Sequence, residues 1–251
     1  KFPVIDDAQG EKMFDDIQKA RKGCESLGGI IECACVNVPA GIGSPIFDGL
    51  ENTLAQLIFG IPAVKGLEFG AGFLTAKMVG SQNNDDFYID ERGHVKTKTN
   101  NHGGILGGIS SGMPITLRVA IKPTPSISQP QDTIDYGNMH NDVLNVKGRH
   151  DPCIVPRAVP CVEAAVNIGI LSHMLDYPKI LICYLLYRIN KPIDSEQLYD
   201  IAVGTEIINY FFYQDAIDYL IKNDSIKVNN DNNIKLFELT EKGRNCAKTL
   251  R

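Results

Sequence analysis

The character of the sequence changes near Asp176, and this change predicts two domains. Glycine-rich loops are confined to the part before it, whereas most of the nine tyrosines follow from Tyr177 onward. The last 75 residues contain ten Lys or Arg and ten Asp or Glu, so the net charge of −5 belongs to the first part. A chain of 251 residues is long enough for one medium and one small domain. We therefore predict a domain over residues 1–175 and a second over residues 176–251.

Composition narrows the functional classes. A net charge of −5 argues against a generally nucleic-acid-binding surface, because such surfaces cluster Lys and Arg. The seven Cys residues form no Cys-x-x-Cys pair, and their odd number without a secretory signal points to reduced thiols in the cytoplasm. Cys33 and Cys35 would share one face of a strand, which favours a core position over a metal site, so no metal is expected. We find no apolar run long enough to cross a membrane.

The first part mixes helical and strand periodicity, which predicts an α+β layered sandwich rather than a doubly wound sheet. Helical spacing covers residues 7–24, 47–60 and 162–175. Runs rich in β-branched residues predict strands at 30–38, 61–69 and 114–121. Residues 86–99 read as a hairpin that turns near Arg92 and Gly93. Residues between 127 and 146 are predicted only as a polar connection.

The second part predicts a small domain of three helices and two strands. The helices cover residues 181–189, which end before Pro192, residues 196–202, which Asp194 and Ser195 cap, and residues 215–222. The strands cover residues 225–228 and 234–239, on either side of an Asn- and Asp-rich turn. This order is that of a winged helix.

A glycine-rich loop over residues 100–112 is one candidate ligand site. It lacks the Gly-Lys-Ser/Thr ending of a Walker A loop and the spacing of a dinucleotide fingerprint. Its glycines would let the backbone approach a ligand closely, although a plain connection can have the same composition. Lys122, Thr124 and Ser126 follow on alternate residues, and in an extended segment they would face one side and suit a phosphate. The alternative is a strand that ends in solvent.

A second candidate is the charged stretch Lys147-Gly148-Arg149-His150-Asp151-Pro152-Cys153. Pro152 biases Asp151 away from helix, and charges just before a helix start suit an anion site. Arg149 and Arg157 have the chemistry to clamp an anion, and Asp151 beside Arg149 would stay ionised and act as a base. The alternative is a solvated turn.

Other titratable residues are weaker candidates. Glu68 and Asp85 fit structural roles, and the roles of His102 and His140 stay open. His150 and Asp151 are sequence neighbours without a serine in a nucleophile elbow, so they do not form a Ser-His-Asp hydrolase site.

Several short motifs taken together closely resemble the chorismate synthase family over about residues 1–175. They occur in this order: Pro39-Ala-Gly-Ile-Gly-Ser-Pro-Ile-Phe-Asp48, Ile61-Pro-Ala-Val-Lys-Gly-Leu-Glu-Phe-Gly70, Gly80-Ser-Gln-Asn-Asn-Asp85, Thr99-Asn-Asn101, Gly103-Gly-Ile-Leu-Gly-Gly-Ile-Ser110, Lys122-Pro-Thr124, Lys147 to Cys153, and Pro156-Arg-Ala-Val-Pro160. The resemblance implies a β-α-β sandwich, a homotetramer, and the 1,4-anti elimination of phosphate from 5-enolpyruvylshikimate 3-phosphate to give chorismate. It also implies reduced FMN as cofactor, with NADPH as a candidate reductant, although the reaction has no net redox change.

The resemblance assigns roles to particular residues. Asp151 matches the acidic residue thought to assist proton removal through the flavin. The family's flavin contacts fall on Pro62, Ala63, Gly107, Lys122, Pro123, Thr124, Pro125, Ser126 and Arg149. Pro62 is a departure, because the family commonly has Asn there.

The same resemblance implies that the family's N-terminal half is missing, with its Gly-Glu-Ser-His-Gly motif and its catalytic histidines. The first residue is Lys1, so we expect a fragment with little or no turnover by itself. The alternative function is a non-catalytic relic whose working part is the winged-helix-like tail, similar to a domain of uncharacterised bacterial proteins. That tail would bind DNA or protein, but its predicted third helix carries two Asp and one Lys, and phosphate contacts need more cations.

Overall fold

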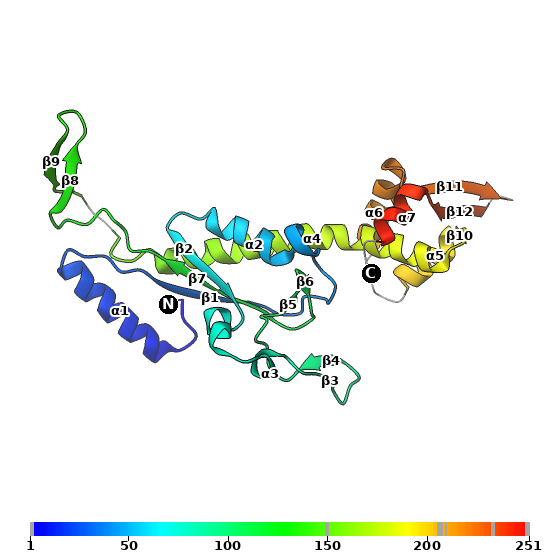
Figure 1. Ribbon diagram of the computed structural model, residues 1–251, viewed down its shortest axis with the longest axis horizontal. Helices are drawn as coiled ribbons and strands as arrows, with labels where there is room; N and C mark the ends of the chain where they lie inside the picture. Colours follow the sequence, from blue (N-terminus) through cyan, green and yellow to red (C-terminus); the bar gives the residue numbers. More distant parts are fainter. Residues whose placement is uncertain (1–2, 149–150, 205–207, 209, 232–233, 249–251) are drawn as a thin grey trace. The chain divides into compact units, whose positions relative to one another are not determined.

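The computed structural model describes residues 3–148, 151–204, 208, 210–231 and 234–248. The chain divides into two compact units, Lys1–Gly169 and Ile170–Arg251. Both units mix helices with antiparallel strands, which confirms the α+β class (Figure 1).

The first unit is built on a three-stranded antiparallel sheet. Its strands are β1 (Gly29–Cys35), β7 (Ile115–Ile121) and β2 (Val64–Phe69), with β7 in the centre. Burial alternates along all of β7, so one face of the sheet is core and the other is half-exposed. The buried face carries Ile115, Leu117, Val119 and Ile121. All three strands lie where the sequence predicts them, within a few residues.

Helices complete the first unit. Helix α1 (Asp7–Lys22) begins at Asp6, whose carboxylate accepts hydrogen bonds from two backbone N–H groups of the first turn. Helix α2 (Leu50–Phe59) follows the short helix η1 (Ile46–Asp48) and buries Leu50, Leu54 and Ile58, which repeat every four residues. It packs closely on helix α4 (Val155–Ile189) at Gly169, where a Cβ atom would lie 2.7 Å from a methyl group of Leu54.

Short hairpins and helices complete the loops of the first unit. The predicted hairpin near Arg92 is confirmed as β3 (Phe87–Ile89) and β4 (Val95–Thr97), and η2 (Gly72–Lys77) and α3 (Gly80–Asn83) precede it. The glycine-rich loop contains a miniature hairpin, β5 (Ile105–Leu106) and β6 (Ile109–Ser110). The predicted polar connection is instead partly a hairpin, β8 (Gln131–Asp135) and β9 (His140–Leu144). Its strands are almost wholly exposed, so no alternation of buried residues marked them in the sequence.

Helix α4 (Val155–Ile189) replaces the two predicted helices at 162–175 and 181–189. Pro178 lacks an N–H and favours a break, yet the helix is continuous there. By length and composition alone it could cross a membrane, because an 18-residue window within it has a mean hydropathy of 1.4, and this corrects the expectation that no segment could. Its apolar residues also serve as core, because Val162 and Val166 are buried in the first unit and Ile182 and Leu186 in the second.

The second unit combines the end of α4 with three further helices and a three-stranded sheet. The helices are α5 (Ser195–Ala202), α6 (Tyr210–Lys222) and α7 (Glu241–Lys248), and the strands pair in the order β10 (Ile193–Asp194), β12 (Ile234–Leu239), β11 (Ile226–Asp231). Asp194 caps α5 as predicted, through a bond from the Glu196 N–H. The sequence did not predict β10 and α7, and α6 begins five residues before the predicted start. The winged-helix assignment stays a prediction.

Tyr213 lies in the core of this second unit with a buried hydroxyl that has no partner among the described residues. Burial raises the pKa of Tyr213 to about 12. We expect Tyr213→Phe to leave the free energy of unfolding unchanged or raise it by about 1 kcal/mol, because it removes an unsatisfied polar atom. Tyr213→Ala, which also removes the ring, should lower it by about 3 kcal/mol or more. Urea unfolding of the full chain compares the two variants, and a clear loss in Tyr213→Phe would reveal a hydroxyl partner.

Cys33 and Cys35 lie half-buried on β1, on one face as predicted. Burial raises the pKa of the Cys33 thiol to about 11 and also raises that of Cys35. Only the thiolate reacts, so at pH 8 we expect alkylation of Cys33 to be about 100-fold slower than that of a thiol with an ordinary pKa, and to accelerate up to pH 11. Exposed Cys24 is the internal control. Iodoacetamide labelling followed by mass spectrometry measures both, and equal rates at pH 8 would contradict the expectation.

Candidate functional site

Two of the predicted ligand segments meet at one end of the central sheet. Strands β2 and β7 are antiparallel, and Val64 pairs with Ile121. Ala63, which precedes Val64, therefore lies beside Lys122, which follows Ile121. The Lys122 N–H donates to the Ala63 carbonyl oxygen at 2.9 Å. Ala63 has a φ of +71°, a left-handed conformation in which the chain turns into β2. The register of the sheet therefore places residues 62–63 against the start of residues 122–126.

The third predicted segment reaches the same end of the sheet through the start of β1. The Leu27 N–H donates to the Pro152 carbonyl oxygen at 2.7 Å, and the Ser26 hydroxyl donates to the Thr124 carbonyl oxygen at 2.6 Å. Gly28 lies between these contacts, and a Cβ atom there would be 2.4 Å from the Ile121 carbonyl oxygen. Ser26 and Gly28 are not among the residues that the sequence predicts for the site, because nothing in their local pattern shows that the backbones come this close.

The side chains of residues 122–126 differ in their surroundings. Lys122 is exposed, whereas Thr124 and Ser126 are half-buried. The Thr124 Oγ1 atom is buried and has no hydrogen-bond partner among the described residues, so its hydrogen-bonding capacity is unused within them. An exposed ammonium and an unpartnered hydroxyl on one short segment suit a phosphate or the polar chain of a flavin nucleotide. The alternative from the sequence, a strand that ends in solvent, also describes this segment, because Lys122 directly after β7 is exposed.

Asp151 is held beside these segments by its neighbours Pro152 and Cys153, which contact the start of β1. Its carboxylate forms an ion pair with Arg157 in the first turn of α4. Arg157, one member of the predicted anion clamp, is therefore paired with Asp151, and the clamp itself stays a prediction. Arg149 and His150 lie outside the described residues.

Gly107 does not join this cluster. It lies in the turn between β5 and β6, and this small hairpin packs near the first residues of β7. Residues 122–126 instead follow the last residue of β7. A strand rises about 3.3 Å per residue, so roughly 20 Å separates the two ends of β7. Gly107 has a φ of +60° and open space where a Cβ atom would project. A ligand that touches both Gly107 and Lys122 would have to lie extended along the sheet.

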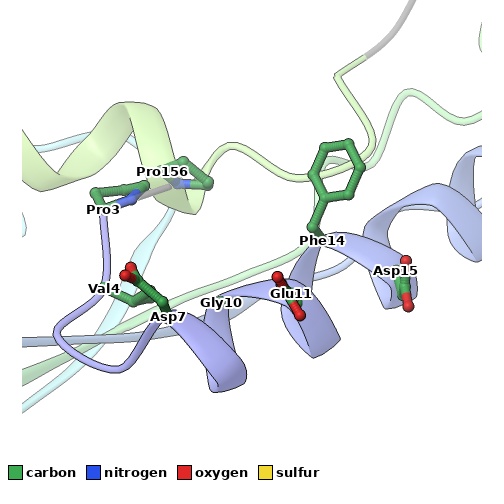
Figure 2. A pocket seen from close by; sticks show the side chains of 8 residues that line it. All are labelled: Pro3, Val4, Asp7, Gly10, Glu11, Phe14, Asp15 and Pro156. Carbon is green, nitrogen blue, oxygen red and sulfur yellow. The ribbon is translucent and has the colours of Figure 1, made fainter. Parts of the chain in front are cut away.

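Two cavities of the first unit lie beside helix α1. The first has a volume of about 830 Å³ and lies between α1 and the chain before it. Figure 2 shows the side chains that line it, among them Asp7, Glu11, Asp15, Phe14 and Pro156. A second, of about 610 Å³, lies between α1 and β1 and shares Leu27, Gly28 and Cys153 with the converging segments. Among the described residues, neither cavity is lined by residues 62–63, 107 or 122–126 or by Asp151. Three carboxylates would also repel a phosphate from the larger cavity, so we place the candidate site at the sheet end.

Comparison with known proteins bears directly on this cluster. The family model described as chorismate synthase matches residues 1–175, the part that contains all three converging segments. The chain belongs to the chorismate synthase family. The remainder, residues 178–251, matches a domain of unknown function, DUF4364.

Individual proteins that are similar to this chain are also chorismate synthases. Chorismate synthase from Korarchaeum cryptofilum is 51% identical over 164 residues, which is 65% of this chain and 45% of that protein. Chorismate synthase from Dehalococcoides mccartyi is 55% identical over 161 residues, which is 64% of this chain and 44% of that protein. A crystal structure of chorismate synthase superposes with a TM-score of 0.54 at 32% identity, over 67% of this chain and 43% of that one. The chain thus spans less than half the length of these relatives.

Proposed function

We propose that this chain supplies one part of a chorismate synthase active site. Together with the part of the fold that it does not contain, it would act as a lyase that eliminates phosphate from 5-enolpyruvylshikimate 3-phosphate to give chorismate. The observation that carries this proposal is the convergence of residues 62–63, 122–126 and 151–153 at one end of the sheet. These segments are distant in sequence, and all lie within the region that matches the family.

We propose reduced FMN as the cofactor, with NADPH as a candidate source of electrons. Lys122 would neutralise negative charge on the cofactor, and Thr124 and Ser126 would donate hydroxyl hydrogen bonds. Ala63 and the rings of Pro62, Pro123 and Pro125 would form backbone and apolar contacts. Pro62 has no N–H, so a contact there cannot be a backbone donation. When bound, the flavin supplies electron density that assists departure of the phosphate.

Asp151 would act as the proton acceptor. Its neighbour Pro152 accepts from the Leu27 N–H and Ser26 donates to the Thr124 carbonyl oxygen, which supports a place for Asp151 at the same end of the sheet as residues 122–126. The Asp151 carboxylate forms an ion pair with Arg157. Its pairing with Arg157 fixes the orientation of the carboxylate without burying it, since almost half of the Asp151 side chain is exposed. Arg149 is proposed as a further cation for the cofactor on the family match alone.

The test is reconstitution. The full chain is mixed with a polypeptide that carries the remaining part of a relative's chorismate synthase, under anaerobic conditions with reduced FMN and substrate. We expect phosphate release only when both polypeptides are present, and a homotetrameric core in the complete assembly by light scattering. Fractionation of the source cells should find the chain in the cytoplasm. No phosphate release from a mixture that forms a stable complex would overturn the proposed activity.

A second candidate function belongs to the tail. Helix α6 presents Tyr210 and Phe211 to solvent, half and three-quarters exposed, together with the exposed carboxylates of Asp215 and Asp218. Exposed aromatic side chains beside acidic groups suit a protein partner, whereas acidic groups repel DNA phosphates. A non-catalytic relic with a protein-binding tail is therefore the alternative to the enzyme. A gel-shift experiment in low salt should detect no DNA binding by the chain. If the chain does bind DNA, and Asp215→Asn binds it more tightly, the DNA-binding role is favoured instead.

A further inference from the structure

A second cluster of reactive side chains lies in the first unit, away from the end of the sheet where residues 62–63 and 122–126 come together. The His102 Nδ1 atom contacts the Asp85 carboxylate, and its Nε2 atom lies 3.1 Å from the Ser111 hydroxyl oxygen. The side chains of His102 and Asp85 are 11% and 3% exposed. These three residues form the serine, histidine and carboxylate relay by which hydrolases activate a serine nucleophile.

The hydrogen bonds of Asp85 fix the proton positions in this relay. Its carboxylate accepts from the Thr99 hydroxyl at 2.6 Å, from the Asn101 N–H at 2.8 Å and from the His102 N–H at 2.9 Å. An ionised carboxylate can only accept, so His102 must carry its proton on Nδ1. The neutral ring then leaves Nε2 as an acceptor for the Ser111 O–H. Burial lowers the pKa of His102, which keeps this neutral, proton-accepting form at neutral pH.

Ser111 is itself held in place and partly accessible. Its N–H donates to the Gly104 carbonyl oxygen at 2.9 Å, and the Met113 N–H lies 3.4 Å from its hydroxyl oxygen. Ser111 is half-buried rather than enclosed, in contrast to Ser110, which is 3% exposed and whose hydroxyl is used by Pro39 and Ile42. Ser111 is therefore the serine of this loop that a small reagent can reach.

We propose that Ser111 is an activated nucleophile that takes acyl groups from small activated esters, with His102 as its general base and Asp85 as the positioning residue. The Ser111 oxygen forms a bond to the acyl carbon while its proton passes to His102 Nε2. The bond from the acyl carbon to the leaving-group oxygen breaks, and that oxygen takes the proton from His102. Water, activated by His102 in the same way, then releases the acid and restores Ser111.

The experiment treats the full chain with p-nitrophenyl acetate, follows release of p-nitrophenol, and locates the acyl group by mass spectrometry. A fluorophosphonate probe serves as a second, irreversible label. We expect both labels on Ser111, no label there in Ser111→Ala, and unchanged labelling in Ser128→Ala, which removes an exposed serine. His102→Gln keeps a hydrogen-bonding side chain without a base and should slow acylation by about 100-fold or more.

The pH dependence separates a nucleophile from a purely structural network. Acylation of the wild type should rise to a plateau with an inflection below pH 6.5, because the lowered pKa keeps His102 neutral to lower pH. Thermal unfolding of each variant shows whether it is folded. If the relay only connects residues 99–102 to the loop, His102→Gln will be less stable but will react with the ester as fast as the wild type. Labelling at residues other than Ser111, or labelling of Ser111 that does not depend on His102, would overturn the proposal. The wild-type pH profile and labelled peptide decide the matter even if a variant does not fold.

Discussion

Gly108→Ala should lower the stability of the first unit by roughly 3 kcal/mol or more, whereas Gly107→Ala, one residue away, should cost only about 1 kcal/mol. Both glycines have a positive φ, +86° and +60° respectively, so both variants bear the left-handed penalty of an L-residue. Only Gly108 is also packed. A Cβ atom there would lie 2.3 Å from the Ser44 carbonyl oxygen and 2.8 Å from the Gly49 Cα atom.

The clash at Gly108 cannot be relieved by a rotamer change, because the obstructing atoms are backbone. The Gly108 carbonyl oxygen also accepts from the Leu50 N–H at 2.8 Å, so moving the loop would break the start of α2. Urea unfolding of the full chain measures both variants against the wild type. Equal losses would show that the space beside Gly108 is not as the structure has it.

Gly107→Ala has a second use as a probe of ligand contact. Nothing lies within 4 Å of the added Cβ atom, so the variant should remain folded. If the flavin approaches this backbone, the methyl group will weaken binding of reduced FMN. Unchanged FMN affinity in a folded Gly107→Ala chain would remove Gly107 from the proposed cofactor contacts.

Asp151→Asn should reduce turnover of the reconstituted enzyme by about 10²- to 10⁴-fold, the usual contribution of a general base. An amide cannot accept the proton but keeps the size of the side chain, so binding of reduced FMN should change little. Stability should also change by less than about 1 kcal/mol, because the Asp151–Arg157 pair is largely exposed and such pairs contribute little.

Two controls make the Asp151 result specific. Asp132→Asn alters an exposed carboxylate on the β8–β9 hairpin and should leave turnover unchanged. Arg157→Ala removes the partner of Asp151 and should reduce turnover less than Asp151→Asn does. Phosphate release under anaerobic conditions measures all three variants. Wild-type turnover in Asp151→Asn would show that the proton goes to another group.

Periodicity in the sequence located the elements whose burial is regular. Helix α2 was predicted because its apolar residues recur at helical spacing, and strand β7 was predicted as a run rich in β-branched residues whose burial alternates in the structure. The same rules failed where burial is irregular. The β8–β9 hairpin is nearly all exposed, and α4 continues through Pro178 where a proline rule predicts an end. Local rules see only neighbouring residues, whereas these outcomes depend on the surroundings of each segment.

The candidate site shows the same limit more sharply. Motif order pointed to Lys122 and Asp151, but the structure was needed to show that Ser26, Gly28 and Ala63 join their segments. The sequence did not predict the relay at Ser111, because Asp85 lies 17 residues before His102 and Ser111 lies 9 residues after it, with no recognisable motif between them. Gly107 carried a family motif yet lies at the opposite end of β7 from Lys122. Contacts across a sheet are set by register, which the local sequence does not reveal.

Anaerobic titration of the full chain with reduced FMN, with and without 5-enolpyruvylshikimate 3-phosphate and followed by phosphate release, tests the central claim most directly. We predict that the chain binds reduced FMN at the end of the sheet, that Lys122→Ala weakens this binding, and that the isolated chain releases little or no phosphate. Absence of FMN binding would contradict the assignment of residues 62–63 and 122–126 as a cofactor site. A clear rate of phosphate release from the isolated chain would contradict the claim that it holds only part of the active site.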